Sequence, residues 1–110
     1  MFSKTPPPPY IAVIFSSQIT DQDTDGYILT ADKMMELAAQ QPGYLGVEAA
    51  RDDDGFGITV SYWDDIAAIK AWKMVGEHQA AQAAGRSKWY KGYITRISEV
   101  TKDYSHGEIS

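Results

Sequence analysis

The sequence contains no cysteine, which excludes disulfides, thiolate nucleophiles, iron–sulfur clusters and cysteine-ligated zinc. The fold must therefore rest on packing alone, which suits a cytoplasmic protein. No segment approaches the roughly twenty apolar residues that a membrane-spanning helix needs. The N-terminus also has no apolar run long enough for a secretory signal. We therefore expect a soluble cytoplasmic protein with no membrane partner.

Positive charge is also scarce. The chain has 10 Lys and Arg against 15 Asp and Glu, which gives a net charge of -5 at pH 7. Nucleic-acid binding needs a clustered basic surface, whereas the basic residues here are scattered, so nucleic acid is not an expected partner. The chain has only 5 prolines, and four of them form the run at positions 6–9. Because such a run favours an extended conformation, residues 1–9 are expected to form a flexible, Pro-rich arm.

The 110 residues are enough for one domain, which we place at residues 10–104, followed by a loose tail at 105–110. Residues 10–19 are β-branched and aromatic and predict a strand. The segment from Tyr27 to the Pro42-Gly43 stop has the spacing of an amphipathic helix. Residues 44–51 and 56–63 predict a hairpin, because the loop between them ends in Asp-Gly.

A second helical region is expected after a cap at Asp64 or Asp65, with an interruption at Gly76 and a short helix over residues 77–84. Residues 89–100 predict the last strand. The order is β-α-β-β-α-β, which is typical of an α+β, ferredoxin-like fold with helices on one face of an antiparallel sheet. Strand residues such as Tyr10 or Trp63 would then be exposed on the other face, so we expect a homodimer.

Three segments, "LAAQQPGYLGVEAARD", "SYWDDIAAIKAW" and "HQAAQAAGRSKWYKGYITRISEV", resemble the antibiotic biosynthesis monooxygenase family. The resemblance covers residues 10–104. It implies a dimeric α/β barrel with a cavity between sheet and helices in each subunit. Members of the family include oxygenases that need no metal, flavin or added cofactor. The resemblance thus implies a cofactor-independent monooxygenase that uses O2 on a small aromatic, phenolic or quinonoid metabolite, with no cofactor and no metal.

Such a reaction requires a pocket that binds a flat molecule, assists its deprotonation and stabilises the resulting anion. An imidazole titrates in the right pH range for such a base, so His78 is the candidate base, and Arg86 could hold the anion. Trp72 resembles a tryptophan that lines the cavity in relatives. These three residues are the catalytic candidates, and the aromatic residues that could bind substrate are Trp72, Trp89, Tyr62 and Tyr93.

Each candidate also has a structural interpretation. His78 could be a helix-start residue bonded to solvent, Trp72 a core residue, and Trp89 a packing or interface residue. The acidic run at residues 52–54 is expected to be a solvated hairpin tip rather than a cation site.

The alternative function is a haem-binding or haem-degrading monooxygenase. Haem-degrading relatives use an Asn on the first strand, a Trp on the later helix and an axial His. Only Trp72 matches this pattern. Gln82 falls near the position of the axial His, and Ser16 or Ser17 falls in the region of the Asn. A third possibility is a non-catalytic dimeric module that binds a ligand.

Overall fold

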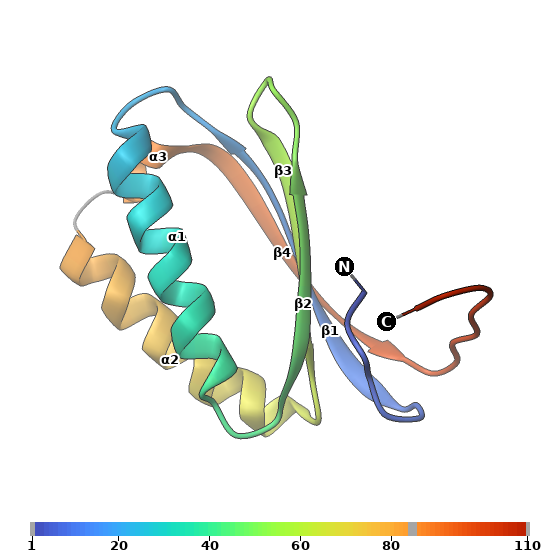
Figure 1. Ribbon diagram of the computed structural model, residues 1–110. Coiled ribbons are helices and arrows are strands. Elements are labelled where there is room, and N and C mark those ends of the chain that lie inside the picture. Colours follow the sequence, from blue (N-terminus) through green and yellow to red (C-terminus); the bar gives the residue numbers. More distant parts are fainter. Residues whose placement is uncertain (1, 84–85, 110) are drawn as a thin grey trace.

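The computed structural model describes residues 2–83 and 86–109, and for residues 77–83 and 86–87 it describes the backbone but not the side chains. Its elements follow the order β1 (Tyr10–Ile19), α1 (Thr24–Ala39), β2 (Tyr44–Arg51), β3 (Phe56–Trp63), α2 (Ile66–Ala83), α3 (Arg86–Trp89) and β4 (Tyr90–Val100). Figure 1 shows α1 and α2 on one side of the sheet and both terminal segments on the other. The β-α-β-β-α-β order predicted from the sequence is confirmed.

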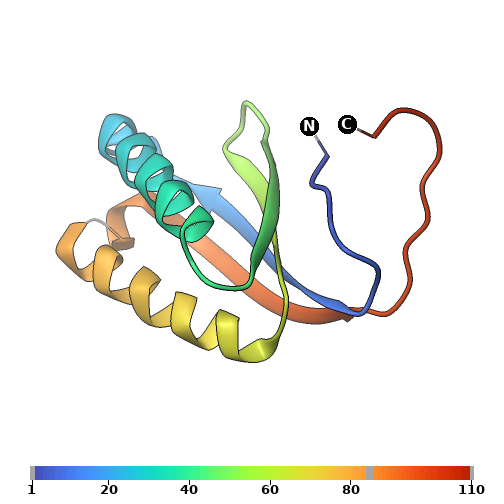
Figure 2. The ribbon, with the colours of Figure 1, turned by 60° about the horizontal axis from the view of Figure 1, so that its bottom comes forward.

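The four strands form one sheet in the order β2-β3-β1-β4, and all neighbours are antiparallel. We call the side that carries α1 and α2 the helix face, and the other side the open face; the layers are seen again in Figure 2. In β1 the odd-numbered residues from Ile11 to Ser17 point to the helix face, because strand side chains alternate. Among the described residues no helix is both long and apolar enough to cross a membrane.

The β2–β3 hairpin has the bounds that the sequence predicts. Its turn is closed by Asp52, whose side chain accepts a hydrogen bond from the Phe56 amide at 3.0 Å. Gly55 has φ +89°, a left-handed backbone that glycine adopts without steric cost. The acidic tip is exposed, so its carboxylates are solvated as expected.

Helix α1 begins at Thr24, three residues before the predicted start at Tyr27. The predicted interruption at Gly76 is wrong, because α2 continues through it from Ile66 to Ala83. One glycine costs a helix only about 1 kcal/mol relative to alanine, which the cooperative bonds on either side can offset. A Cβ at Gly76 would lie 3.3 Å from the Met34 side chain, so glycine here also lets α1 and α2 approach. Of the two predicted caps, Asp64 and Asp65, it is Asp65 whose side chain accepts a hydrogen bond from the Ala68 amide, at 2.9 Å.

The buried core lies at one end of the helix face, where Trp63 is fully enclosed by residues of β1, α1 and α2. Its buried members are Ile11, Ala38, Trp63 and Ile69. The expectation that Trp63 is exposed is wrong: it is 0% exposed because its side chain points toward the helices.

Tyr10 does lie on the open face, yet it is only 5% exposed, so that expectation is also wrong. Its ring meets that of Tyr62 edge-on at 5.9 Å, and its hydroxyl donates to Asp103 of the tail beyond β4 at 2.6 Å. The N-terminal arm contacts the same sheet, since the amide of Ser3 donates to Glu48 at 2.9 Å.

Candidate functional site

The four aromatic residues predicted to bind substrate do not meet in one place. Trp72 stacks on Trp63, with ring centroids 5.9 Å apart and planes inclined by 25°, so it packs against the core. Tyr62 lies on the open face, where its hydroxyl donates to Glu48 at 2.7 Å. Trp89 and Tyr93 lie at the end of the helix face away from the core. Only these last two share a site.

The two polar candidates, His78 and Arg86, fall in the part of the chain whose side chains lie outside the described residues. Their backbones belong to α2 and α3, respectively. Gln82, the residue near the ligand position in the haem comparison, is in the same segment. The roles of His78 and Arg86 therefore stay predictions.

Five rings gather at the end of the helix face that is distant from the core, and we call them the aromatic cluster: Phe15, Tyr27, Trp89, Tyr90 and Tyr93. Phe15 lies 5.7 Å from Tyr90 and 5.3 Å from Tyr93, measured between ring centroids. Tyr27 meets Tyr90 edge-on at 5.8 Å. Trp89 is buried, whereas Tyr93 is 42% exposed. The cluster thus offers flat apolar surface that is only partly enclosed.

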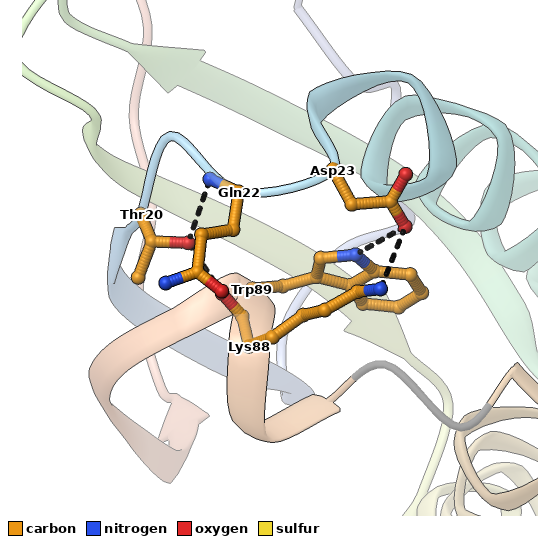
Figure 3. A network of polar contacts seen from close by, with 5 residues as sticks. All are labelled: Thr20, Gln22, Asp23, Lys88 and Trp89. Atoms are coloured by element: carbon orange, nitrogen blue, oxygen red, sulfur yellow. Dashed lines mark hydrogen bonds and ion pairs between the residues drawn. The ribbon is translucent and has the colours of Figure 1, made fainter.

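A polar network fixes Trp89 in this cluster (Figure 3). Its indole N–H donates to the carboxylate of Asp23 at 3.2 Å, and the ammonium of Lys88 lies 3.7 Å from the same oxygen. The Thr20 amide donates to the Trp89 carbonyl at 2.8 Å. The Thr20 hydroxyl also donates to the Lys88 carbonyl and accepts from the Gln22 amide. The loop before α1 is therefore joined to α3 at several points.

Asp23 adopts φ 52°, an uncommon left-handed backbone for a residue other than glycine. Its side chain makes no capping bond to α1. Its carboxylate instead accepts a hydrogen bond from the indole of Trp89 and pairs with the ammonium of Lys88. These contacts hold Asp23 in its strained backbone conformation.

Next to the aromatic cluster, one row of residues crosses the sheet on the helix face. Arg51 pairs with Gly57, Gly57 with Ser17, and Ser17 with Tyr93. A Cβ at Gly57 would lie 2.7 Å from the guanidinium carbon of Arg51, so the absence of a side chain makes room for the Arg51 side chain. Arg51 can therefore reach across β3 to β1.

The guanidinium of Arg51 donates four hydrogen bonds. Two come from Nη1, to the carbonyls of Gly55 at 2.7 Å and Ser17 at 3.2 Å. The other two come from Nη2, to the hydroxyls of Ser17 at 2.8 Å and Tyr27 at 2.9 Å. The guanidinium carbon also lies 5.5 Å from the centre of the Tyr27 ring. We call Arg51, Ser17 and Tyr27 the Arg51 cluster.

All four acceptors of the Arg51 cluster are neutral oxygens. Within the described part of the chain Arg51 forms no ion pair, so its charge is balanced by no carboxylate. Ser17, one of its partners, is only 1% exposed. A half-buried cation among neutral dipoles attracts anions more strongly than the same cation in water would.

Arg51 was not predicted from the sequence as a site residue, although a signal was present. In the strand Tyr44–Arg51 the alternation places Val47, Ala49 and Arg51 on the same face. A cationic side chain at the end of an apolar row that faces the protein interior needs hydrogen-bond or charged partners there. The sequence does not reveal those partners, because they come from a strand 34 positions away and from a helix.

The open face holds a separate set of perturbed groups around Glu48. The hydroxyl of Tyr62 and the amide of Ser3 both donate to this carboxylate, and together they lower its pKa. Burial raises the pKa of Tyr62 well above its usual value, and the bond to Glu48 adds to this effect. The pKa of Tyr10 is raised mainly by burial and then by Asp103. These bonds attach the N-terminal arm and the tail to the sheet.

Comparison with known proteins accounts for this architecture. The model of the family described as "Antibiotic biosynthesis monooxygenase" matches residues 10–84, which is more than half of the chain. The chain belongs to the antibiotic biosynthesis monooxygenase family. The resemblance noted from the sequence is thus confirmed.

Two curated relatives span nearly the whole chain. The uncharacterized protein YqjZ of Bacillus subtilis is 57% identical over 100 residues, covering 91% of this chain and 87% of its own length. A protein of Pyricularia oryzae named "Jasmonate monooxygenase ABM" is 26% identical over 102 residues, covering 89% of this chain. The match covers only 46% of the Pyricularia protein, so that relative is about twice as long.

Solved structures of low identity share the fold. SnoaB from Streptomyces nogalater, described as a cofactor-independent oxygenase, has a TM-score of 0.65 at 12% identity, with 92% of this chain and 100% of that chain covered. A dimeric ferredoxin-like protein of unknown function from Thermobifida fusca has a TM-score of 0.64 at 15% identity, covering 84% and 92%. Ferredoxin-like topology is therefore common to this chain and both structures.

Proposed function

We propose that this protein is a cofactor-independent monooxygenase that uses O2 on a small aromatic, phenolic or quinonoid metabolite, and that it works in the cytoplasm. The observation that carries the proposal is the aromatic cluster beside the Arg51 guanidinium, which has no carboxylate partner among the described residues, in a chain of this family. The names of the Pyricularia and Streptomyces relatives support an oxygenase activity.

The proposed reaction draws its electrons from the substrate. A phenol that loses its proton becomes an electron-rich phenolate, which can reduce O2 without a metal or flavin. One oxygen atom enters the ring as a carbonyl and the other leaves as water, so a phenol and O2 give a quinone and H2O. The protein must therefore remove a proton, hold an anion and keep the ring in place.

We assign proton removal to His78 and anion binding to Arg86, with Trp72 as part of the wall. An imidazole with an ordinary pKa can accept a phenolic proton near neutral pH. Trp89 and Tyr93 supply ring surface from the aromatic cluster. Tyr62 is left out of this assignment, because its hydroxyl lies on the open face and is bonded to Glu48.

The test is O2 uptake by the purified protein with dihydroxynaphthalenes and their one-ring analogues, together with the absorbance of the quinone formed. One O2 consumed per quinone supports the proposal. His78→Ala is expected to lower kcat by about 10²-fold or more, the usual contribution of a general base. The matched control is His106→Ala, because His106 is an exposed tail residue and its loss should leave kcat unchanged.

Two results would overturn this assignment. Saturable binding of one haemin per chain, followed by bleaching with ascorbate in air, would identify a haem-degrading protein instead. Tight binding of the phenols with no O2 uptake above the buffer rate would identify a binding module without catalysis.

We further propose that the protein is a homodimer in which a second copy covers the open face. Phe56, Ile58 and Ile94 are 46%, 43% and 53% exposed, and register and alternation place all three on that face. Residues 91–99 of β4 are exposed throughout, on both faces of the strand. A contiguous apolar surface of this kind favours association with a partner. The Thermobifida structure, which is described as dimeric, supports a homodimer.

Sedimentation velocity tests the dimer. Ile58→Asp should convert it to monomers, since a buried unpaired carboxylate is costly. Leu29→Asp is the control, because Leu29 is 72% exposed on α1. Dissociation by Leu29→Asp alone would place the interface on the helices, and a monomeric wild type would refute the dimer.

A further inference from the structure

We propose that the Arg51 cluster is a binding site for the anionic oxygen of a flat aromatic acid, such as an aromatic carboxylate. The aromatic part of this ligand rests on the proposed function, whereas the anion site rests on the geometry of Arg51, Ser17 and Tyr27 alone. None of these three residues was among the site residues expected from the sequence.

The Tyr27 hydroxyl can donate a hydrogen bond to a ligand. A guanidinium can only donate hydrogen bonds, so the Tyr27 hydroxyl must accept the bond from Nη2 of Arg51 at 2.9 Å. Its own hydrogen therefore remains available for another acceptor. No described residue accepts that hydrogen in the structure. A hydroxyl that accepts from a cation is also a stronger donor, because hydrogen bonds in a chain polarise one another.

The Arg51 guanidinium supplies a positive charge beside this hydroxyl. An anion bound at the Tyr27 hydroxyl would lie near a guanidinium that has no carboxylate partner among the described residues. The nearby Asp52 does not supply one, since its side chain accepts from the Phe56 amide in the hairpin turn. The four bonds to neutral oxygens hold the guanidinium in place before any ligand arrives. Such preorganisation lowers the cost of binding an anion.

The aromatic cluster supplies ring surface for the flat part of the ligand. The ring of Tyr27 belongs to both groups: its hydroxyl meets Arg51, while its edge meets Tyr90 at 5.8 Å and Trp89 at 6.1 Å. Tyr93 stands beside Ser17 in the same row of the sheet and is 42% exposed. A ligand whose anionic group sits at Tyr27 can therefore place a ring against the aromatic cluster.

A purely structural role for Arg51, as a tie between the hairpin, β1 and α1, predicts no preference between charged and neutral ligands. The test is therefore binding of 2-naphthoate against 2-naphthamide, which have nearly the same shape and differ in charge. Isothermal titration calorimetry gives the affinities in the absence of turnover, so a failure of the oxygenase assay leaves this result intact.

The expected result is that the wild type binds 2-naphthoate at least tenfold more tightly than 2-naphthamide. Tyr27→Phe keeps the ring and removes only the hydroxyl, so it should cut this preference several-fold while the protein stays folded. Arg51→Met should abolish the preference. Arg51→Lys should restore part of it, because lysine keeps the charge but lacks the planar fork of donors.

The site is located by the indole N–H resonances of Trp89 and Trp63, two of the three tryptophans, in 1H–15N spectra. Addition of 2-naphthoate should shift the resonance of Trp89, which contacts Tyr27. The resonance of Trp63 should stay unchanged, because Trp63 is enclosed in the core at the other end of the helix face. Equal affinity for the two probes, or an unchanged preference in folded Tyr27→Phe, would overturn the proposal. A shift of Trp63 alone would overturn the location.

Discussion

Gly57→Ala tests whether the space above β3 is reserved for the Arg51 side chain. The added Cβ would lie 2.7 Å from the guanidinium carbon and 3.0 Å from both Nε of Arg51 and the carbonyl oxygen of Ala50. The guanidinium can move only by releasing some of its four hydrogen bonds, and the carbonyl belongs to the backbone of β2. Either adjustment costs free energy.

Overpacking of this kind typically destabilises a protein by about 1–3 kcal/mol. The hydrogen bonds that Arg51 would release are of similar worth, about 0.5–1.5 kcal/mol each. We therefore expect Gly57→Ala to lower the free energy of unfolding by about 1–3 kcal/mol. Without a steric obstacle the same change would be neutral or stabilising by up to about 1 kcal/mol, because alanine restricts the unfolded chain.

Gly92→Ala provides the matched control within the same sheet. Nothing lies within 4 Å of the Cβ that it would add, and its backbone needs no left-handed φ. Urea unfolding followed by tryptophan fluorescence measures both variants, at one protein concentration because association would shift the midpoint. The reasoning is refuted if the two variants are equally stable. It is also refuted if Gly57→Ala costs as much in an Arg51→Ala background, since removal of the side chain should relieve most of the clash.

Three further predictions use the same measurement. Trp63→Ala should lower the free energy of unfolding by about 3–5 kcal/mol, because the side chain is 0% exposed, and a loss below 1 kcal/mol would contradict the assigned core. The lowered pKa of Glu48 contributes stability above its unfolded pKa of 4.5 that is lost as pH falls through the folded value. Glu48→Gln should therefore flatten the decline in stability over this acidic range, and an unchanged slope would contradict the bond from Tyr62. Asp23→Leu should cost about 1–2 kcal/mol more than Asp23→Asn, which keeps an acceptor for Trp89; equal losses would contradict that bond.

The strands were predictable because their signal is local. Alternating β-branched and aromatic residues, with Asp-Gly at the turn, mark the bounds of β2 and β3 without knowledge of the rest of the chain. The break at Gly76 was predicted wrongly because the prediction used only the low helix propensity of glycine. It did not include the packing of α2 on α1. Its proximity to Met34 appears only once the two helices are placed together.

The sequence predicts which residues of a strand share a face, but it does not predict which face of the sheet the helices cover. The pattern in β3 separates Gly57, Thr59, Ser61 and Trp63 from the residues between them. Trp63 was nevertheless expected on the uncovered side, because both sets contain aromatic residues and alternation carries no direction. The hydrogen bond from its indole N–H to Ser61, at 2.9 Å, is what allows this polar atom to be buried among the core residues.

The Arg51 cluster could not be predicted for a different reason. Its three side chains come from β2, β1 and α1, and they meet only because the registers of two strand pairs place Arg51 and Ser17 in one row. A shift of either pair by one residue would turn Arg51 or Ser17 to the open face. The sequence gives the residue types of such a site, whereas pairing decides whether they meet.

The two ends of the helix face differ in a way that separates stability from function. At one end Trp63 and its neighbours are closed to solvent, and substitutions there should cost folding free energy. At the other end Tyr27 is half-buried and Tyr93 is 42% exposed, and this is the end at which we propose that a ligand binds. Conservative changes such as Tyr27→Phe should therefore alter binding at little cost in stability. Trp72 marks the boundary: because it stacks on Trp63, its replacement should first be measured as a loss of stability and only then as a loss of activity.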